Sequence, residues 1–213
     1  MLACGPVSVF GVCSMKRLAL AGLVLACAGP ALADEPFEGR GYVIACGEEG
    51  CFVNAAGMDL FVPLDAGAER LAGYPMMAAV DLAGTLSDIG DATASLALES
   101  AARVADDLHE GNLIALQGDW KPRDEGSPFH IGIYGMDWNE IVMDEVEARF
   151  MISVGTACAD GTEHKGSVLN LYRYGDDPAA DACWLLEYVD DTMLTLRNVG
   201  GGGEAVEFDR ITP

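Results

Sequence analysis

The residue types best suited to chemistry in this chain are three histidines, seven cysteines and 34 carboxylates. No two histidines have metal-ligand spacing, and the sequence has no phosphate-loop, nucleophile-elbow or zinc-protease pattern. His164, in CADGTEHKG, is close in sequence to Asp160 and Glu163, but this stretch is typical of a solvated hairpin loop. Among so many carboxylates no catalytic pair stands out. We therefore expect no enzyme, no metal site and no cofactor.

The cysteines indicate an oxidising compartment. Four of them, Cys46, Cys51, Cys158 and Cys183, belong to the expected mature chain, and an even count predicts two disulfides. Four cysteines permit three connectivities, of which we favour the local pairs Cys46–Cys51 and Cys158–Cys183. An alternative is that Cys46, Cys51 and nearby methionines bind copper. Four intervening residues do not fit a Cys-x-x-Cys redox motif, which favours the disulfide.

The first 33 residues have the pattern of a secretory signal that starts at Met15. Two positive residues precede an apolar run, and Ala-Leu-Ala ends at Ala33, where a signal peptidase would cut. The run is too short to span a bilayer. We expect a periplasmic or secreted protein, with membrane attachment only if Cys27, in a lipoprotein-like LVLAC stretch, is lipidated.

The mature chain is strongly acidic. Cleavage after Ala33 leaves 10 basic and 34 acidic residues, so the formal charge becomes −24. This charge repels phosphate backbones, which excludes nucleic acid as a partner, and favours cationic ligands or basic proteins. Half of the residues are hydrophobic, so the chain has enough apolar side chain for a packed core.

Two-residue alternation predicts an all-β, mainly antiparallel fold. In VEARFMISV, the residues Val146, Ala148, Phe150, Ile152 and Val154 would share one face of a strand. Similar runs at 167–174, 183–189, 192–199 and 204–211 are separated by Asp, Gly and Pro, as in a meander. In the N-terminal part, Asp65 would cap one short helix that ends at Leu71.

A boundary is expected where proline, glycine and charge accumulate in GDWKPRDEGSPF. We predict two small β domains, 34–117 and 118–213, although the length also permits one large sandwich. The first domain would be an OB-like or irregular β barrel, with glycine-interrupted, curved strands. The second would be a meander barrel.

The second half has Gly118-Asp119-Trp120 on its first strand and Arg210 on its last. Arg210 shares a face with Val206 and Phe208, so it points with apolar residues and needs a partner such as the Trp120 ring. Over residues 118–210 the chain resembles the lipocalin and wider calycin superfamily, which carries Gly-x-Trp on the first strand and a packing arginine on the last. The resemblance implies that Gly118, Trp120 and Arg210 close a lipocalin-like barrel. Since the segment is short for eight strands, we expect a barrel of about half that size.

We expect a non-enzymatic exported binding protein. Its partner would be a small apolar ligand at the barrel mouth or a basic protein, as for a periplasmic inhibitor. Aromatic residues line pockets, so the candidates for the mouth are Tyr134, Trp138, Trp184 and Tyr188. The other function classes considered are an envelope stress or copper-homeostasis factor and a hydrolase with a carboxylate pair. The oligomeric state is not predicted.

Overall fold

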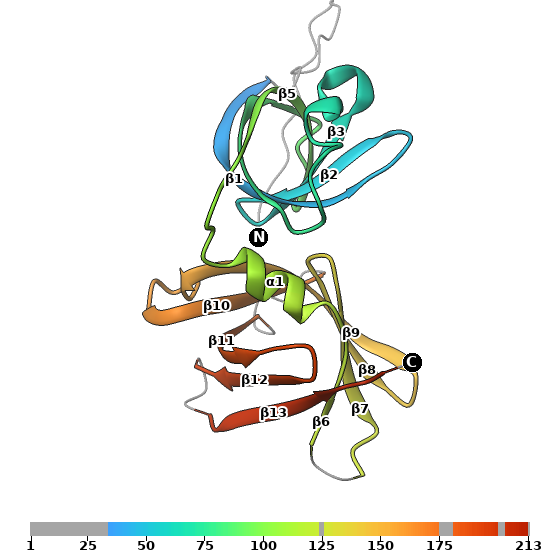
Figure 1. Ribbon diagram of the computed structural model, residues 1–213, viewed down its shortest axis with the longest axis vertical. Coiled ribbons are helices and arrows are strands. Elements are labelled where there is room, and N and C mark those ends of the chain that lie inside the picture. The colour runs from blue at the N-terminus through green and yellow to red at the C-terminus, as the bar shows by residue number, and fades with distance from the viewer. Residues whose placement is uncertain (1–33, 124–125, 175–180, 200–202, 213) are drawn as a thin grey trace, which may run out of the picture. The chain divides into compact units, whose positions relative to one another are not determined.

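The computed structural model of the chain describes residues 34–123, 126–174, 181–199 and 203–212. The expected signal segment, including Met15 and Cys27, lies outside the described residues. The described chain is all-β and mostly antiparallel, with one short α-helix and two closed barrels that follow each other in sequence (Figure 1).

The first barrel has five strands in the order β1-β2-β3-β5-β4. The β3 and β5 strands pair in parallel, and the other neighbours pair antiparallel. This regular closed barrel corresponds to the OB-like expectation and not to the irregular one. Its strands are β1 (Glu35–Cys46), β2 (Gly50–Ala55), β3 (Met58–Pro63), β4 (Ala79–Ser87) and β5 (Thr93–Arg103).

The connection between β3 and β4 contains two 3-10 turns, η1 (Leu64–Ala66) and η2 (Ala68–Arg70). The expected helix capped by Asp65 is therefore wrong, since the structure shows no side-chain cap at either turn. Gly67 separates the turns with a φ of 105°. A Cβ atom at Gly67 would lie 2.5 Å from the carbonyl oxygen of Leu98, so a continuous helix built from ordinary residues does not fit here.

The second barrel has eight strands, each antiparallel to the next, and β13 closes it against β6. The expectation of a half-size barrel is thus wrong. Most strands are only five to eight residues long and the turns between them are short, so eight strands fit into fewer than 100 residues. The strands are β6 (Gly118–Pro122), β7 (Phe129–Tyr134), β8 (Asp137–Val142), β9 (Glu145–Ala157), β10 (Glu163–Arg173), β11 (Ala182–Val189), β12 (Met193–Asn198) and β13 (Ala205–Arg210).

The alternation predicted for β9 holds over part of the strand. Phe150 and Ile152 are buried in the core of the second barrel, and Ala148 and Val154 pack against it. Val146 departs from the predicted alternation, because it is 45% exposed and its side chain does not face the core. The pairing of β8 with β9 shifts register beyond Ala148, so one extra residue forms a bulge that reverses the facing of Val146.

The helix α1 (Glu110–Leu116) was not predicted from the sequence. Asp107 precedes it and accepts hydrogen bonds from the backbone N–H groups of His109 and Glu110, at 2.9 and 3.0 Å. These bonds satisfy amide groups that a helix start leaves free. On its inner face, Leu113 and Leu116 are buried in the core of the second barrel.

Both disulfides join the predicted partners. Cys46 and Cys51 lie opposite each other on β1 and β2, and Cys158 and Cys183 link the end of β9 to β11. Two disulfides favour a non-reducing, exported environment. In this state the sulfur atoms of Cys46 and Cys51 are bonded to each other and not present as copper-binding thiolates. Within the ranges that the structure describes, no helix has the length and apolar character needed to cross a membrane.

Candidate functional site

The three residues expected to close the second barrel lie together. The guanidinium carbon of Arg210 lies 4.2 Å from the centre of the Trp120 ring, and Trp120 is fully buried. Arg210 also donates to the backbone oxygens of Gln117 and, at 2.6 Å, of Ala115 at the end of α1. A Cβ atom at Gly118 would approach an Arg210 nitrogen to 2.7 Å, so glycine leaves room for the guanidinium. This arrangement joins α1, β6 and β13.

Two of the four aromatic residues expected at the barrel mouth meet. Trp138, on β8, and Trp184, on β11, stack with ring centres 6.5 Å apart. Trp138 is 2% exposed, and its Nε1 atom makes no hydrogen bond of normal geometry within the described residues. Glu140 follows on the same face of β8, where burial raises its pKa while the Trp138 indole and Arg173 act in the opposite direction.

The other two aromatic residues are elsewhere. Tyr134, at the end of β7, is 54% exposed and donates to Asp119 at 2.6 Å. Tyr188 is also exposed and donates to Asp190 in the turn between β11 and β12. The structure therefore brings Trp138 and Trp184 together, but it does not gather all four residues around one opening.

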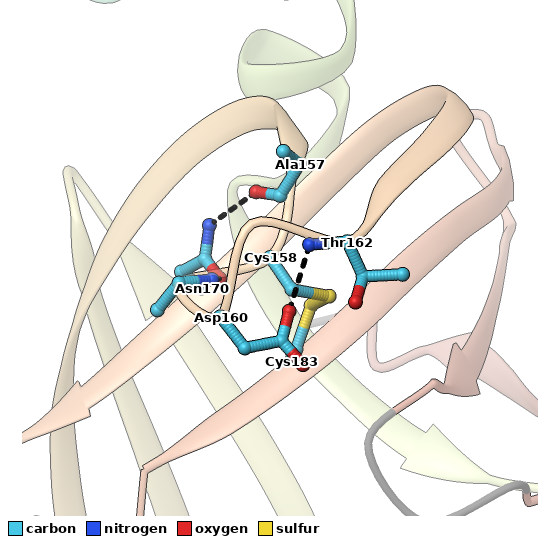
Figure 2. The surroundings of a disulfide bond; sticks show 7 residues. Ala157, Cys158, Asp160, Thr162, Asn170 and Cys183 are labelled. Carbon is cyan, nitrogen blue, oxygen red and sulfur yellow. Dashed lines mark hydrogen bonds between the residues drawn. A yellow bond between two sulfur atoms is a disulfide. The ribbon is translucent and has the colours of Figure 1, made fainter.

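A hollow that sequence reasoning did not predict lies beside the second disulfide, at the tip of the β9–β10 hairpin. It has a volume of about 380 Å³, which is within the range of small-ligand pockets. The disulfide between Cys158 and Cys183 fastens the hairpin tip to β11, as Figure 2 shows. The tip is therefore covalently fixed where it forms one wall of the hollow.

Asn170 on β10 also holds the hairpin tip. Its side-chain amide donates to the backbone oxygen of Ala157 at 3.0 Å and accepts from the N–H group of Ala159 at 2.9 Å (Figure 2). Asn170 is 93% buried, since 7% of its surface is exposed, and its two bonds satisfy both ends of the amide. A buried amide with paired groups fixes the hairpin in one position.

The turn at the hairpin tip orients one carboxylate. The N–H group of Thr162 donates to Oδ1 of Asp160 at 2.8 Å, and Cys158 pairs with Thr162 through backbone atoms (Figure 2). Hydrogen bonds from the backbone and side chain of Thr162 lower the pKa of Asp160, so this group is ionised at neutral pH. Asp160 thus supplies a fixed negative charge to the hollow.

A second carboxylate also lines the hollow. Asp181, just before β11, accepts from the backbone N–H group of Arg173 at 2.9 Å. The hollow, which we call the hairpin cavity, contains no lysine or arginine among its described lining residues. Those residues are Cys158, Ala159, Asp160, Thr162, His164, Asn170, Leu171, Tyr172, Asp181, Ala182, Cys183, Asn198 and Val199.

The lining of the hairpin cavity combines carboxylate, imidazole, hydroxyl and amide groups. Asp160, His164 and Asp181 all line it. Within the described ranges, however, no group of three His, Cys, Asp or Glu side chains is close enough to hold a metal. Two carboxylates, together with hydroxyl and amide groups, suit an ammonium or guanidinium group on a longer chain.

A serine–histidine contact lies at the start of α1. The Oγ atom of Ser167 is 2.9 Å from Nδ1 of His109 and accepts a hydrogen bond from Asn112 at 2.9 Å. Burial lowers the pKa of His109, so its ring is neutral at pH 7. Asp107 binds the backbone of His109 and not its ring, so the arrangement is not a catalytic triad. These bonds attach α1 to β10.

Sequence analysis found some of these residues and missed others. His164 and Asp160 were noted, but as members of a solvated loop. Asp181 stood out only as one of several carboxylates in GDDPAADA, a stretch that departs from the calcium-loop pattern. Asn170 gave no signal, because it becomes relevant only when the hairpin folds back over β10 and β11. The start of α1 could have been predicted, since Asp107 and Glu110 have the three-residue spacing that is typical of a capping residue and the first turn of a helix.

Comparisons of the chain with protein-family models, with curated proteins and with solved structures gave no significant match.

Proposed function

We propose that this chain is an exported, periplasmic, non-enzymatic protein that binds a basic protein partner, as an inhibitor would, and that the hairpin cavity receives a lysine or arginine side chain. The observation that carries the proposal is the lining of the cavity. It presents the carboxylates of Asp160 and Asp181 and has no lysine or arginine among its described residues. A cation from a partner would supply the missing counter-charge.

The charge balance of the whole chain supports a cationic partner. Residues 34–117 contain 15 acidic and 3 basic residues, and residues 118–213 contain 19 and 7, so each half has a formal charge of −12. Five of the ten described arginines and lysines are in ion pairs, which involve seven carboxylates. Half of the cationic side chains are thus paired internally, while most carboxylates stay outside these ion pairs and can attract a basic protein.

The test is capture from periplasmic extract of the native host, with the mature chain immobilised. We expect the retained proteins to be basic and to be released when the salt concentration is raised from about 0.1 M to about 1 M. The Asp160→Asn/Asp181→Asn variant should capture several-fold less of these proteins than the wild-type chain. Asparagine keeps the Oδ1 acceptors that bind Thr162 and Arg173, so the variant removes charge with little change in the turn.

The matched control is Asp144→Asn/Glu145→Gln, at the turn between β8 and β9. It removes the same formal charge from the same barrel at exposed positions away from the hairpin cavity. We expect it to capture as much partner as the wild-type chain. Equal loss in both double variants would show that only total charge matters, and retention of no basic protein would refute the proposal.

A second candidate function is the binding of a small apolar ligand in the second barrel. The resemblance to lipocalins through Gly118, Trp120 and Arg210 suggests it, and the stacked rings of Trp138 and Trp184 favour it. A flat apolar ligand could stack on these two rings. We regard this candidate as weaker, because many buried side chains already fill the barrel core.

Tryptophan fluorescence tests the second candidate. All three tryptophans are in the second barrel, so ligand entry next to Trp138 should change the emission. The probes are fatty acids and small aromatic amides, titrated into the wild-type chain and into Trp184→Leu. Saturable quenching that Trp184→Leu weakens would support the lumen as a site. No saturable change with any probe would count against it.

A further inference from the structure

The first barrel carries an exposed aromatic surface that the proposal above does not use. Phe52 on β2 and Phe61 on β3 lie directly opposite each other, with ring centres 5.0 Å apart. Phe52 is 49% exposed, and Leu64, which follows β3, is 51% exposed. We call Phe52, Phe61 and Leu64 the aromatic platform. Single exposed apolar residues are common on proteins, but the two contacting rings of Phe52 and Phe61 are more informative.

The backbone next to the platform is fixed. Gly50 pairs with Pro63, and a Cβ atom at Gly50 would lie 2.2 Å from the carbonyl oxygen of Val62 and 3.0 Å from the Phe61 ring. Glycine therefore allows Phe61 to lie flat against the start of β2. The Cys46–Cys51 disulfide closes the adjoining turn. A fixed apolar surface loses little conformational freedom when it binds a partner.

Carboxylates border the platform. Glu48 and Glu49 are exposed in the turn that the Cys46–Cys51 disulfide closes, and the backbone oxygen of Glu49 accepts from the N–H group of Leu64 at 3.2 Å. Asp65 is exposed directly after Leu64. The apolar group is thus continuous in the chain with three acidic residues. A second copy of this chain is a poor occupant, because it brings the same negative charge to the contact.

We propose that the aromatic platform docks a basic, amphipathic peptide segment of a partner protein, with apolar side chains on Phe52, Phe61 and Leu64 and lysines or arginines beside Glu48, Glu49 and Asp65. Cationic groups are attracted both to the carboxylates and to aromatic faces. The inference adds a second contact surface to the proposed function, but it is testable without the hairpin cavity.

The experiment measures fluorescence anisotropy of labelled peptides with the mature chain. The probes are a peptide of alternating leucine and lysine, an oligolysine of equal charge and a peptide of alternating leucine and serine. We expect the leucine–lysine peptide to bind at least about tenfold more tightly than either of the others. Equal affinity for the oligolysine would overturn the role of the aromatic residues, and equal affinity for the leucine–serine peptide would overturn the role of the carboxylates.

Variants locate the contact. Phe52→Ser should bring the affinity for the leucine–lysine peptide close to that for oligolysine, while Phe52→Leu should retain part of the preference. The matched control is Ile114→Ser, since Ile114 is 48% exposed on α1 and the change also removes an apolar side chain. Glu48→Gln/Glu49→Gln should weaken binding of both cationic peptides. Circular dichroism melting verifies that each variant is folded.

The two proposals fail separately. Asp160→Asn/Asp181→Asn should leave the preference for the leucine–lysine peptide unchanged. If that variant abolishes the preference, or if Phe52→Ser and Phe52→Leu both bind as the wild-type chain does, the platform is not the contact. If the preference depends on Phe52 while periplasmic extract yields no basic partner, the proposed function fails and the platform stands.

Discussion

Arg210 should contribute more to the stability of the second barrel than any surface ion pair. Its guanidinium donates to two backbone oxygens at the end of α1 and lies over the Trp120 ring. A hydrogen bond from a charged group is worth about 1.5–3 kcal/mol, and a cation–π contact about 0.5–2 kcal/mol. The carbonyls regain water when the charge is removed, so the terms do not add fully. We expect Arg210→Met to cost roughly 3 kcal/mol of unfolding free energy.

The assay is urea unfolding followed by tryptophan fluorescence. Because Trp120, Trp138 and Trp184 all lie in strands of the second barrel, the emission reports this barrel and not the first. With a slope of about 1.5 kcal/mol per M, a loss of about 3 kcal/mol lowers the midpoint by about 2 M urea. Arg210→Lys should lie between the wild-type chain and Arg210→Met, because lysine keeps the charge but not the planar fork.

The control is Arg123→Met. Arg123 is bonded to Glu207 and Asp209 at an exposed site, where solvent screening leaves an ion pair with little net effect on stability. If Arg210→Met costs no more than Arg123→Met, the guanidinium does not join α1 to the barrel as the geometry indicates, and the reasoning is refuted.

Three further predictions concern the disulfides and two titrating groups. Cys158→Ser/Cys183→Ser should cost about 3.5 kcal/mol and Cys46→Ser/Cys51→Ser about 2 kcal/mol, since the loops they close span 25 and 5 residues; urea unfolding that gives the reverse order would contradict the loop-entropy argument. The hydrogen bond to Asp119, with burial, raises the pKa of Tyr134 to about 12. The stability from this bond is therefore present below the ordinary tyrosine pKa of about 10 and is lost as the pH rises through about 12; ultraviolet difference titration of wild-type against Tyr134→Phe should show it, and Asp119→Asn should lower this pKa. Burial acts to raise the pKa of Asp107, but hydrogen bonds from His109, Tyr42 and Glu110 outweigh it and lower the pKa. Its contribution to stability is thus present above about pH 4 and is lost as the pH falls through the lower folded value; Asp107→Asn should remove this part of the acid dependence in urea titrations, and an unchanged acid profile would contradict it.

Local patterns in the sequence predicted much of the architecture. Alternation in β9 predicted a strand with Phe150 and Ile152 inward, and cysteine spacing predicted both disulfides. Gly118, Trp120 and Arg210 could be selected because a charged residue on an apolar strand face needs a partner within the fold. The β9 strand and the disulfides could be predicted because they depend on residues close in sequence. The contact of Arg210 with Trp120 could be predicted because few residues can serve as partner for an arginine on an apolar strand face.

Other features depended on strand register and on turns, which local sequence does not determine. The bulge that turns Val146 outward arises from the pairing of β8 with β9, and a shift of one residue reverses every side chain. The second barrel has eight strands because its strands and turns are short, and the lengths of the turns were not predicted from the sequence. Sequence indicated four aromatic residues at one opening, but the barrel brought only Trp138 and Trp184 together.

The sequence by itself determined the acidic charge and the β-strand content, because composition and alternation are local properties, and it favoured the local cysteine pairs among three possible connectivities. Only the tertiary structure decided which carboxylates share a cavity. Asp160 and Asp181 are 21 positions apart in the chain, and they line one cavity because the hairpin between β9 and β10 folds back and the Cys158–Cys183 disulfide holds it against β11.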